Sequence, residues 1–122
     1  MKRFAMTVEG RAVPKGRPRV TFSTGRAITY TPKRTRAWEE KVAWEYRCQV
    51  GATMFAEGEE LALHCVFHAP HKSADGDNLF KAVADALQEV AYPNDSAIVE
   101  GWFQIKRKGP PSVLIVCMAA ES

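Results

Sequence analysis

The chain has 122 residues, enough for one domain with a buried core but too few for a catalytic domain plus an independent regulatory one. Hydrophobic residues make up 46% and charged residues 25%, proportions that argue against disorder of the whole chain. The net charge of +3 is unevenly spread, and no apolar run approaches the roughly 20 residues of a membrane helix, so we expect a cytoplasmic protein with no membrane segment.

The first third of the chain predicts a strand followed by a basic hairpin. Residues 3–13 read as a strand that stops at Pro14, and residues 14–31 as a long loop or a hairpin with its turn at residues 23–25. No acidic residue occurs between residues 11 and 36. This segment holds the following Lys and Arg residues: Arg11, Lys15, Arg17, Arg19, Arg26, Lys33, Arg34 and Arg36. Such a block makes a local positive field suited to a polyanion, although a solvated basic loop explains the block equally well when it is taken alone.

A helix is predicted over residues 32–50, because Thr31 can cap it, Pro32 is tolerated in its first turn and Gly51 ends it. Three cations would lie in that first turn: Lys33, Arg34 and Arg36. Cations there oppose the helix dipole, a small cost that is reasonable if a phosphate binds nearby.

The rest of the chain alternates strands and a second helix. Residues 61–68 alternate like a half-buried strand, and residues 78–91 carry one apolar stripe of a helix that Asp77 can cap. Residues 98–108 read as a strand whose inward side chains are Val99, Phe103 and Ile105. Residues 112–118 form an apolar run short enough to be a central strand covered on both faces.

These elements predict a single α+β (mixed α/β) domain over residues 1–122. Its mixed sheet would have about four to five strands, packed with two main helices at about 32–50 and 78–91. Three cysteines, Cys48, Cys65 and Cys117, stand in apolar or periodic segments without a Cys-x-x-Cys spacing, so we expect buried free thiols.

Carboxylates near the ends of predicted elements indicate possible metal chemistry. Asp75 and Asp77 lie two apart in extended chain, so both side chains can point the same way. Two carboxylates this close repel each other unless a divalent cation neutralises them, and Mg²⁺ prefers one or two carboxylates together with water and substrate phosphate. Asp95, in the turn after the second helix, can return to the same place. For each aspartate a cap or turn role remains an alternative.

Lys81 lies four residues after Asp77 and four before Asp85, so the three share one helical face. A lysine there could balance the carboxylates, contact a scissile phosphate or orient the attacking water. An ordinary salt bridge to either neighbouring aspartate is the alternative.

Two other metal sites are disfavoured. A calcium-binding EF-hand fails because Leu79, Phe80 and Ala86 occupy positions that need an oxygen ligand, a glycine and a bidentate glutamate. Zinc is not expected, because His64 and His68 are four residues apart on a strand, about 13 Å.

The motif Asp75-x-Asp-Asn-x-x-Lys81, followed by Asp85-Ala-Leu87 and Asn94-Asp95, resembles the RusA family of Holliday junction resolvases. The segment Pro14-Lys-Gly-Arg-Pro-Arg19 also looks like that family, so the resemblance covers nearly the whole chain.

The resemblance implies a homodimeric endodeoxyribonuclease that depends on Mg²⁺, which Mn²⁺ can replace, and resolves four-way DNA junctions by paired nicks. By the same resemblance Asp75, Asp77 and Asp95 would bind the metal and Lys81 would be catalytic. We expect the DNA to be held by the basic block, namely by Lys15, Arg17, Arg19, Arg26, Lys33, Arg34 and Arg36. Two other functions remain open: a magnesium nuclease for other branched or single-stranded DNA, and a non-catalytic nucleic-acid-binding module.

Overall fold

A computed structural model describes residues 2–14, 19–23, 25–30, 33–70 and 75–120, with only the backbone considered in 19–23 and 26–30. The elements, in chain order, are β1 (Arg3–Glu9), β2 (Arg19–Ser23), β3 (Arg26–Tyr30), α1 (Lys33–Gln49), β4 (Leu61–His68), α2 (Gly76–Ala86), the 3-10 turn η1 (Asp95–Ala97), β5 (Ile98–Lys106) and β6 (Ser112–Ala119). Neither described helix combines the length and the apolar character of a membrane span.

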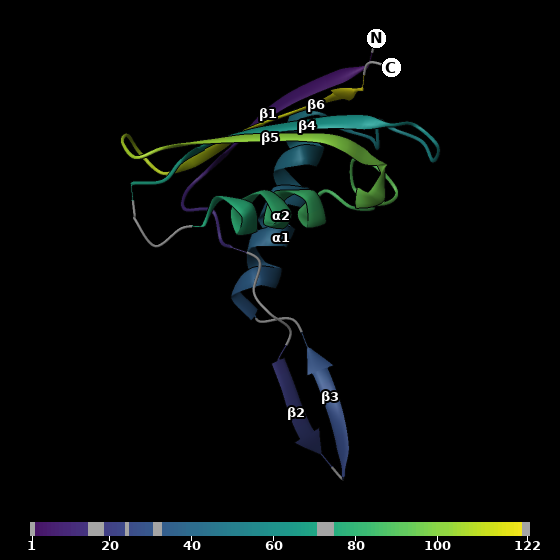
Figure 1. Cartoon of the computed structure of the whole chain (residues 1–122), viewed down its shortest axis with the longest axis vertical. Helices are drawn as coiled ribbons and strands as arrows, with labels where there is room; N and C mark the ends of the chain where they lie inside the picture. The colour runs from purple at the N-terminus through teal and green to yellow at the C-terminus, as the bar shows by residue number, and fades with distance from the viewer. Residues whose placement is uncertain (1, 15–18, 24, 31–32, 71–74, 121–122) are drawn as a thin grey trace.

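Four strands form one mixed sheet in the order β1-β6-β4-β5. β6 pairs antiparallel with both β1 and β4, whereas β4 and β5 run parallel. Both helices lie on the same side of this sheet, and the β2–β3 hairpin extends past the amino-terminal end of α1, away from the sheet (Figure 1). The predicted α+β fold is therefore confirmed, including the hairpin.

The core lies between the sheet and the two helices. On β4 the helix-facing residues Leu61, Leu63, Cys65 and Phe67 are completely buried, as their alternating pattern predicts. The buried face of α1 carries Trp38, Val42 and Tyr46. This packing fixes α2 against the sheet, and with it the carboxylates at the start of that helix.

Two predictions about the sheet are wrong. β6 is central but is covered on one face only, since Leu114 on its other face is 39% exposed. On β5, Val99 and Phe103 were expected to be inward and covered; Phe103 does face α2, next to Gly76, but the two side chains are 55% and 38% exposed. The reason is the strand order: β5 is an edge strand, so its side chains lie at the margin of the core and are only partly covered.

The limits of α2 also differ from the prediction. The helix begins at Gly76 and ends at Ala86, five residues before the expected end at residue 91. The chain turns instead at Glu89, which adopts a positive φ of 66° and donates its backbone N–H to the Tyr92 carbonyl. Cys48 was expected to be buried but is exposed on α1, whereas Cys65 and Cys117 are buried free thiols as expected.

Candidate active site

The first two candidate aspartates lie at the amino-terminal end of α2. Asp75 is the N-cap, and its Oδ1 accepts the backbone N–H of Asp77 at 3.1 Å. The sequence suggested Asp77 for this capping role, so the structure moves the cap two residues earlier. Asp77 lies in the first turn, where the helix dipole stabilises a negative charge. Both side chains are exposed, so the pair is accessible to a cation or a phosphate from solvent.

Gly76, between the two aspartates, allows α2 to approach β5 closely. A Cβ atom at this position would lie 2.2 Å from Cε1 of Phe103. A similar contact occurs one turn later, because a Cβ at Gly101 would lie 2.7 Å from Cζ of Phe80. Sequence reasoning missed both glycines and both rings as supports of the site. The available signal was Gly101 inside a predicted strand, whereas Gly76 stood in the loop predicted before the helix.

Lys81 lies on the exposed face of α2, one turn after Asp77. Asp85 follows one turn later and is partly buried. Asp77, Lys81 and Asp85 therefore lie along one face of α2, as predicted.

Asp95 lies in the η1 turn after α2 and just before β5. The turn is held by Asn94, whose Oδ1 accepts the Ser96 N–H at 2.9 Å, and by Gln88, whose Oε1 accepts the Asp95 N–H at 3.0 Å. Burial raises the pKa of the Tyr92 hydroxyl, and the nearby charges of Asp95 and Asp85 add to the shift. The hydrogen bond to Gln88 places Asp95 just beyond the carboxy-terminal end of α2.

The three predicted metal ligands are not brought together within one chain. Asp75 and Asp77 are at the start of α2, and Asp95 is tied to Gln88 beyond its end. A helix of 11 residues spans about 16 Å, so the two ends are too far apart for one ion. In the described ranges, no three His, Cys, Asp or Glu side chains form a group able to hold a metal.

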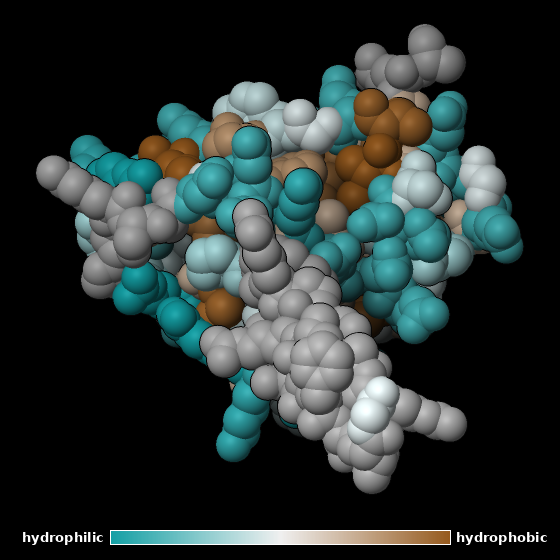
Figure 2. Space-filling model, turned by 60° about the horizontal axis from the view of Figure 1, so that its bottom comes forward, coloured by the Kyte–Doolittle hydropathy of each residue, from teal (hydrophilic) through white to brown (hydrophobic). Residues whose placement is uncertain are grey.

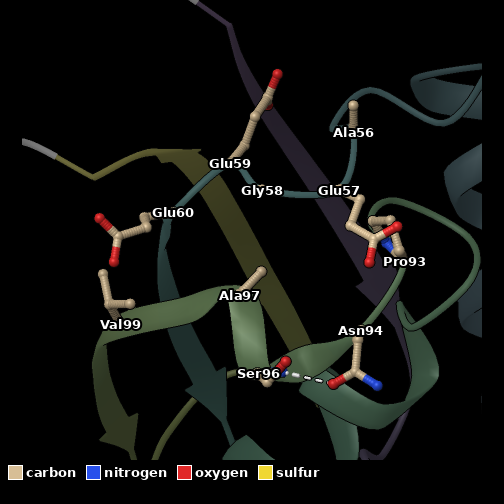
Figure 3. Close-up of a pocket in the computed structure, with 10 residues that line it drawn as sticks. All are labelled: Ala56, Glu57, Gly58, Glu59, Glu60, Pro93, Asn94, Ser96, Ala97 and Val99. Atoms are coloured by element: carbon tan, nitrogen blue, oxygen red, sulfur yellow. Dashed lines mark hydrogen bonds between the residues drawn. The ribbon is translucent and has the colours of Figure 1, made fainter.

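A cavity beside the Asp95 turn is bordered by acidic side chains. Its lining includes Glu57, Glu60, Asn94 and Val99, and Figure 3 shows Glu60 next to Val99 at the start of β5. The glutamates make the cavity unsuited to a phosphate group, since like charges repel.

The predicted DNA-binding residues are only partly described. Lys33, Arg34 and Arg36 are exposed on the first turn of α1, as expected. Arg19 and Arg26 begin the two strands of the hairpin, but only their backbone is described. Lys15 and Arg17 lie outside the described residues. Figure 2 views the molecule from the helix side and shows hydrophilic side chains interrupted by separate hydrophobic patches.

The fold and these residues define a small α+β protein with an acidic helix end and a separate basic hairpin. The family model for endodeoxyribonuclease RusA matches residues 9–116. No curated protein matches the chain. The chain belongs to the RusA endodeoxyribonuclease family, and it is accordingly a nuclease that cleaves DNA.

Proposed function

We propose that the protein is a magnesium-dependent endonuclease that resolves four-way DNA junctions by paired, symmetric cuts in DNA recombination and repair. The observation that carries the proposal is the exposed pair Asp75 and Asp77 at a helix start, followed one turn later by Lys81, in a chain of the RusA family. Such a substrate would place the enzyme in the cytoplasm.

The donor set of this helix end fits a hard divalent cation. Mg²⁺ is usually bound by one or two carboxylates, with water and substrate phosphate completing its octahedron. Asp75 and Asp77 would supply such a pair, and Mn²⁺ accepts the same oxygen ligands. When bound, the cation would polarise a phosphoryl oxygen and lower the pKa of a bound water.

A second copy of the chain would complete this site. Asp95 lies beyond the far end of α2, so one chain offers two of the three expected ligands at the helix start. In a two-fold dimer with antiparallel α2 helices, Asp95 of each chain would approach Asp75 and Asp77 of the other. A homodimer would then hold two identical sites, which suits two symmetric cuts.

The side chains have separable roles in this scheme. Lys81 presents an ammonium group one turn from Asp77, where it would contact the scissile phosphate and balance the charge that develops on it. The cations of the first turn of α1 and the basic hairpin would bind flanking phosphates. Since phosphate contacts carry no sequence information, recognition would depend mainly on the shape of the junction.

A cleavage panel tests the proposal. The protein is incubated with labelled four-way, flap, single-stranded and linear duplex DNA in Mg²⁺, in Mn²⁺ and in EDTA. We expect fastest cleavage of the four-way junction, with cuts at symmetric positions and none in EDTA. Faster cleavage of flaps or single strands would favour a nuclease of another substrate class.

The variant Asp75→Asn separates catalysis from binding. It removes one negative charge from the site while keeping the size of the side chain, so we expect junction binding without cleavage. Glu40→Asn, on the exposed face of α1, is the matched control and should cut normally. Cleavage of the junction at the normal rate by Asp75→Asn would show that the site is wrongly assigned. Salt-sensitive binding by a wild-type protein that cuts no DNA would instead indicate a binding module.

A further inference from the structure

The sheet has two faces, and both helices lie on one of them (Figure 1). Alternate residues of a strand lie on opposite sides of a sheet, so each strand also presents a row of side chains to the other side, which we call the open face. No helix or strand of the described chain packs on the open face. Whether solvent or a partner covers it depends on which side chains it carries.

The centre of the open face is apolar. The strand registers bring the following side chains together: Ala5, Val66, Trp102, Leu114, Val116 and Met118. Trp102 and Leu114 are 47% and 39% exposed, and Val66, Val116 and Met118 are partly exposed. A sheet face in contact with water normally carries polar residues, whereas a contiguous apolar patch marks an interaction site.

His64 is a polar side chain within this centre, between Trp102 and Val116. Its Nε2 lies 3.5 Å from Oε2 of Glu100 at the margin of the face, and its ring packs on that of Trp102 with the centroids 5.7 Å apart. The polar edge of the imidazole is therefore directed to the margin, so a partner can cover the apolar centre without isolating it.

Charges of alternating sign mark the four corners of the open face. Arg3 and Glu9 lie at the two ends of its β1 side, and Glu100 and Lys106 lie at the two ends of its β5 side. All four side chains are exposed. Arg3 is in the same cross-strand row as Glu100, and Glu9 is in the same row as Lys106. Each positive corner therefore has a negative neighbour both across the sheet and along its own strand.

This pattern of charges is complementary to a second copy of itself. Two sheets that pack face to face usually keep their strands aligned to within about 30°. In an aligned pair with two-fold symmetry, the axis runs either along the strands or across them. Along the strands, Arg3 meets Glu100 and Lys106 meets Glu9. Across them, Arg3 meets Glu9 and Lys106 meets Glu100, so opposite charges meet in both cases, whereas an orthogonal packing would bring like charges together.

We propose that two copies of the chain associate through their open faces, with their strands aligned, their apolar centres in contact and their corner charges paired. Four strands about 4.8 Å apart and four rows about 6.7 Å apart make a face of about 500 Å². The pair would bury about 1,000 Å² in total, which is the lower limit of a specific interface. The association should therefore be reversible and depend on protein concentration.

The open face lies on the side of the sheet opposite α2, so Asp75, Asp77 and Lys81 remain accessible in this arrangement. The contact is separate from the two-fold arrangement of α2 helices proposed for the cleavage site, and it would join two such dimers into a tetramer. The cleavage sites would then lie on the two outer surfaces of the tetramer. The interface itself does not depend on the nuclease function.

Charge reversal at the corners tests the interface through the mass of the protein in solution. An acidic variant carries Arg3→Glu and Lys106→Glu, so all four corners are negative. A basic variant carries Glu9→Lys and Glu100→Lys, so all four are positive. A control with Arg36→Glu and Arg47→Glu reverses two exposed cations on α1 instead. Leu114→Thr tests the apolar centre without altering the charge, and circular dichroism checks that each protein is folded.

Analytical ultracentrifugation over a range of concentrations should show the wild type and the control reaching twice the mass of the acidic or the basic variant. We expect each of these two variants to associate at least about 100-fold more weakly than the wild type, and Leu114→Thr at least about tenfold more weakly. An equal mixture of the acidic and basic variants should form the heavier species again, because every corner then meets one of opposite sign.

A wild type no heavier than the acidic and basic variants, or a mixture of the two without the heavier species, would overturn the interface. Junction cleavage is measured separately. A protein that associates as described but cuts no DNA would refute the nuclease function and leave the interface standing, and a protein that cuts junctions without this association would do the reverse.

Discussion

The contact between Gly76 and Phe103 gives a sharp prediction about the support of the active site. In Gly76→Ala, the new Cβ would begin 2.2 Å from Cε1 of Phe103, whereas carbon atoms in normal contact are about 3.5–4.0 Å apart. The ring is 38% exposed and can swing outward, so the strain is partly relieved. We expect Gly76→Ala to lower the free energy of unfolding by about 1–3 kcal/mol, the usual cost of overpacking.

The effect of Gly76→Ala on the free energy of unfolding should change sign when the Phe103 ring is absent. In a Phe103→Ala background the three atoms nearest to the new methyl group are gone, and alanine in a helix is favoured over glycine by up to about 1 kcal/mol. Urea denaturation of the four proteins, at one concentration, gives the coupling free energy of this double-mutant cycle. If Gly76→Ala lowers the free energy of unfolding equally in both backgrounds, the close packing of α2 on β5 is refuted.

Three further predictions follow from the site and the core. Lys81→Ala should slow junction cleavage by about 10²–10³-fold with little loss of binding, because its ammonium group is assigned to the reacting phosphate; single-turnover kinetics and a binding titration measure the two effects. Alkylation of the folded protein should modify Cys48 rapidly and leave Cys65 and Cys117 unmodified until urea is added, as mass spectrometry of the digested protein can show. Burial raises the pKa of the Cys117 thiol from 9.0 to about 12, and that of the Tyr92 hydroxyl above its ordinary value, so folding favours their protonated forms. The melting temperature should therefore be nearly constant from pH 7 to about 9 and fall at higher pH, and a rise above pH 10 would contradict this linkage.

Local patterns in the sequence predict most of the elements. The alternation of residues 61–68 matches the bounds of β4, and the Thr31-Pro32 start and Gly51 stop define α1 to within one residue. These signals succeed because periodicity and capping depend on neighbouring residues alone. Because the helix start was predicted from these local signals, Lys33, Arg34 and Arg36 lie in the first turn of α1 as expected.

The errors arise where the outcome depends on strand order. Val99 and Phe103 have the spacing of inward residues, and only the place of β5 at the sheet edge leaves them exposed. The early end of α2 depends on Tyr92 in the following loop. Its hydroxyl donates a hydrogen bond to the Ala84 carbonyl at 2.6 Å. Because the chain passes this end of α2 before entering β5, Asp95 lies away from Asp75, which no spacing in the sequence indicates.

Cleavage by a mixture of two inactive variants tests the account most directly. Asp75→Asn and Asp95→Asn are purified separately, mixed, allowed to exchange subunits and added to a four-way junction in Mg²⁺. If each site takes Asp75 from one chain and Asp95 from the other, the mixed dimer has one intact site, and we predict that it nicks one strand of the junction while each variant alone is inactive. A mixture that forms mixed dimers but remains as inactive as its components would contradict the shared site.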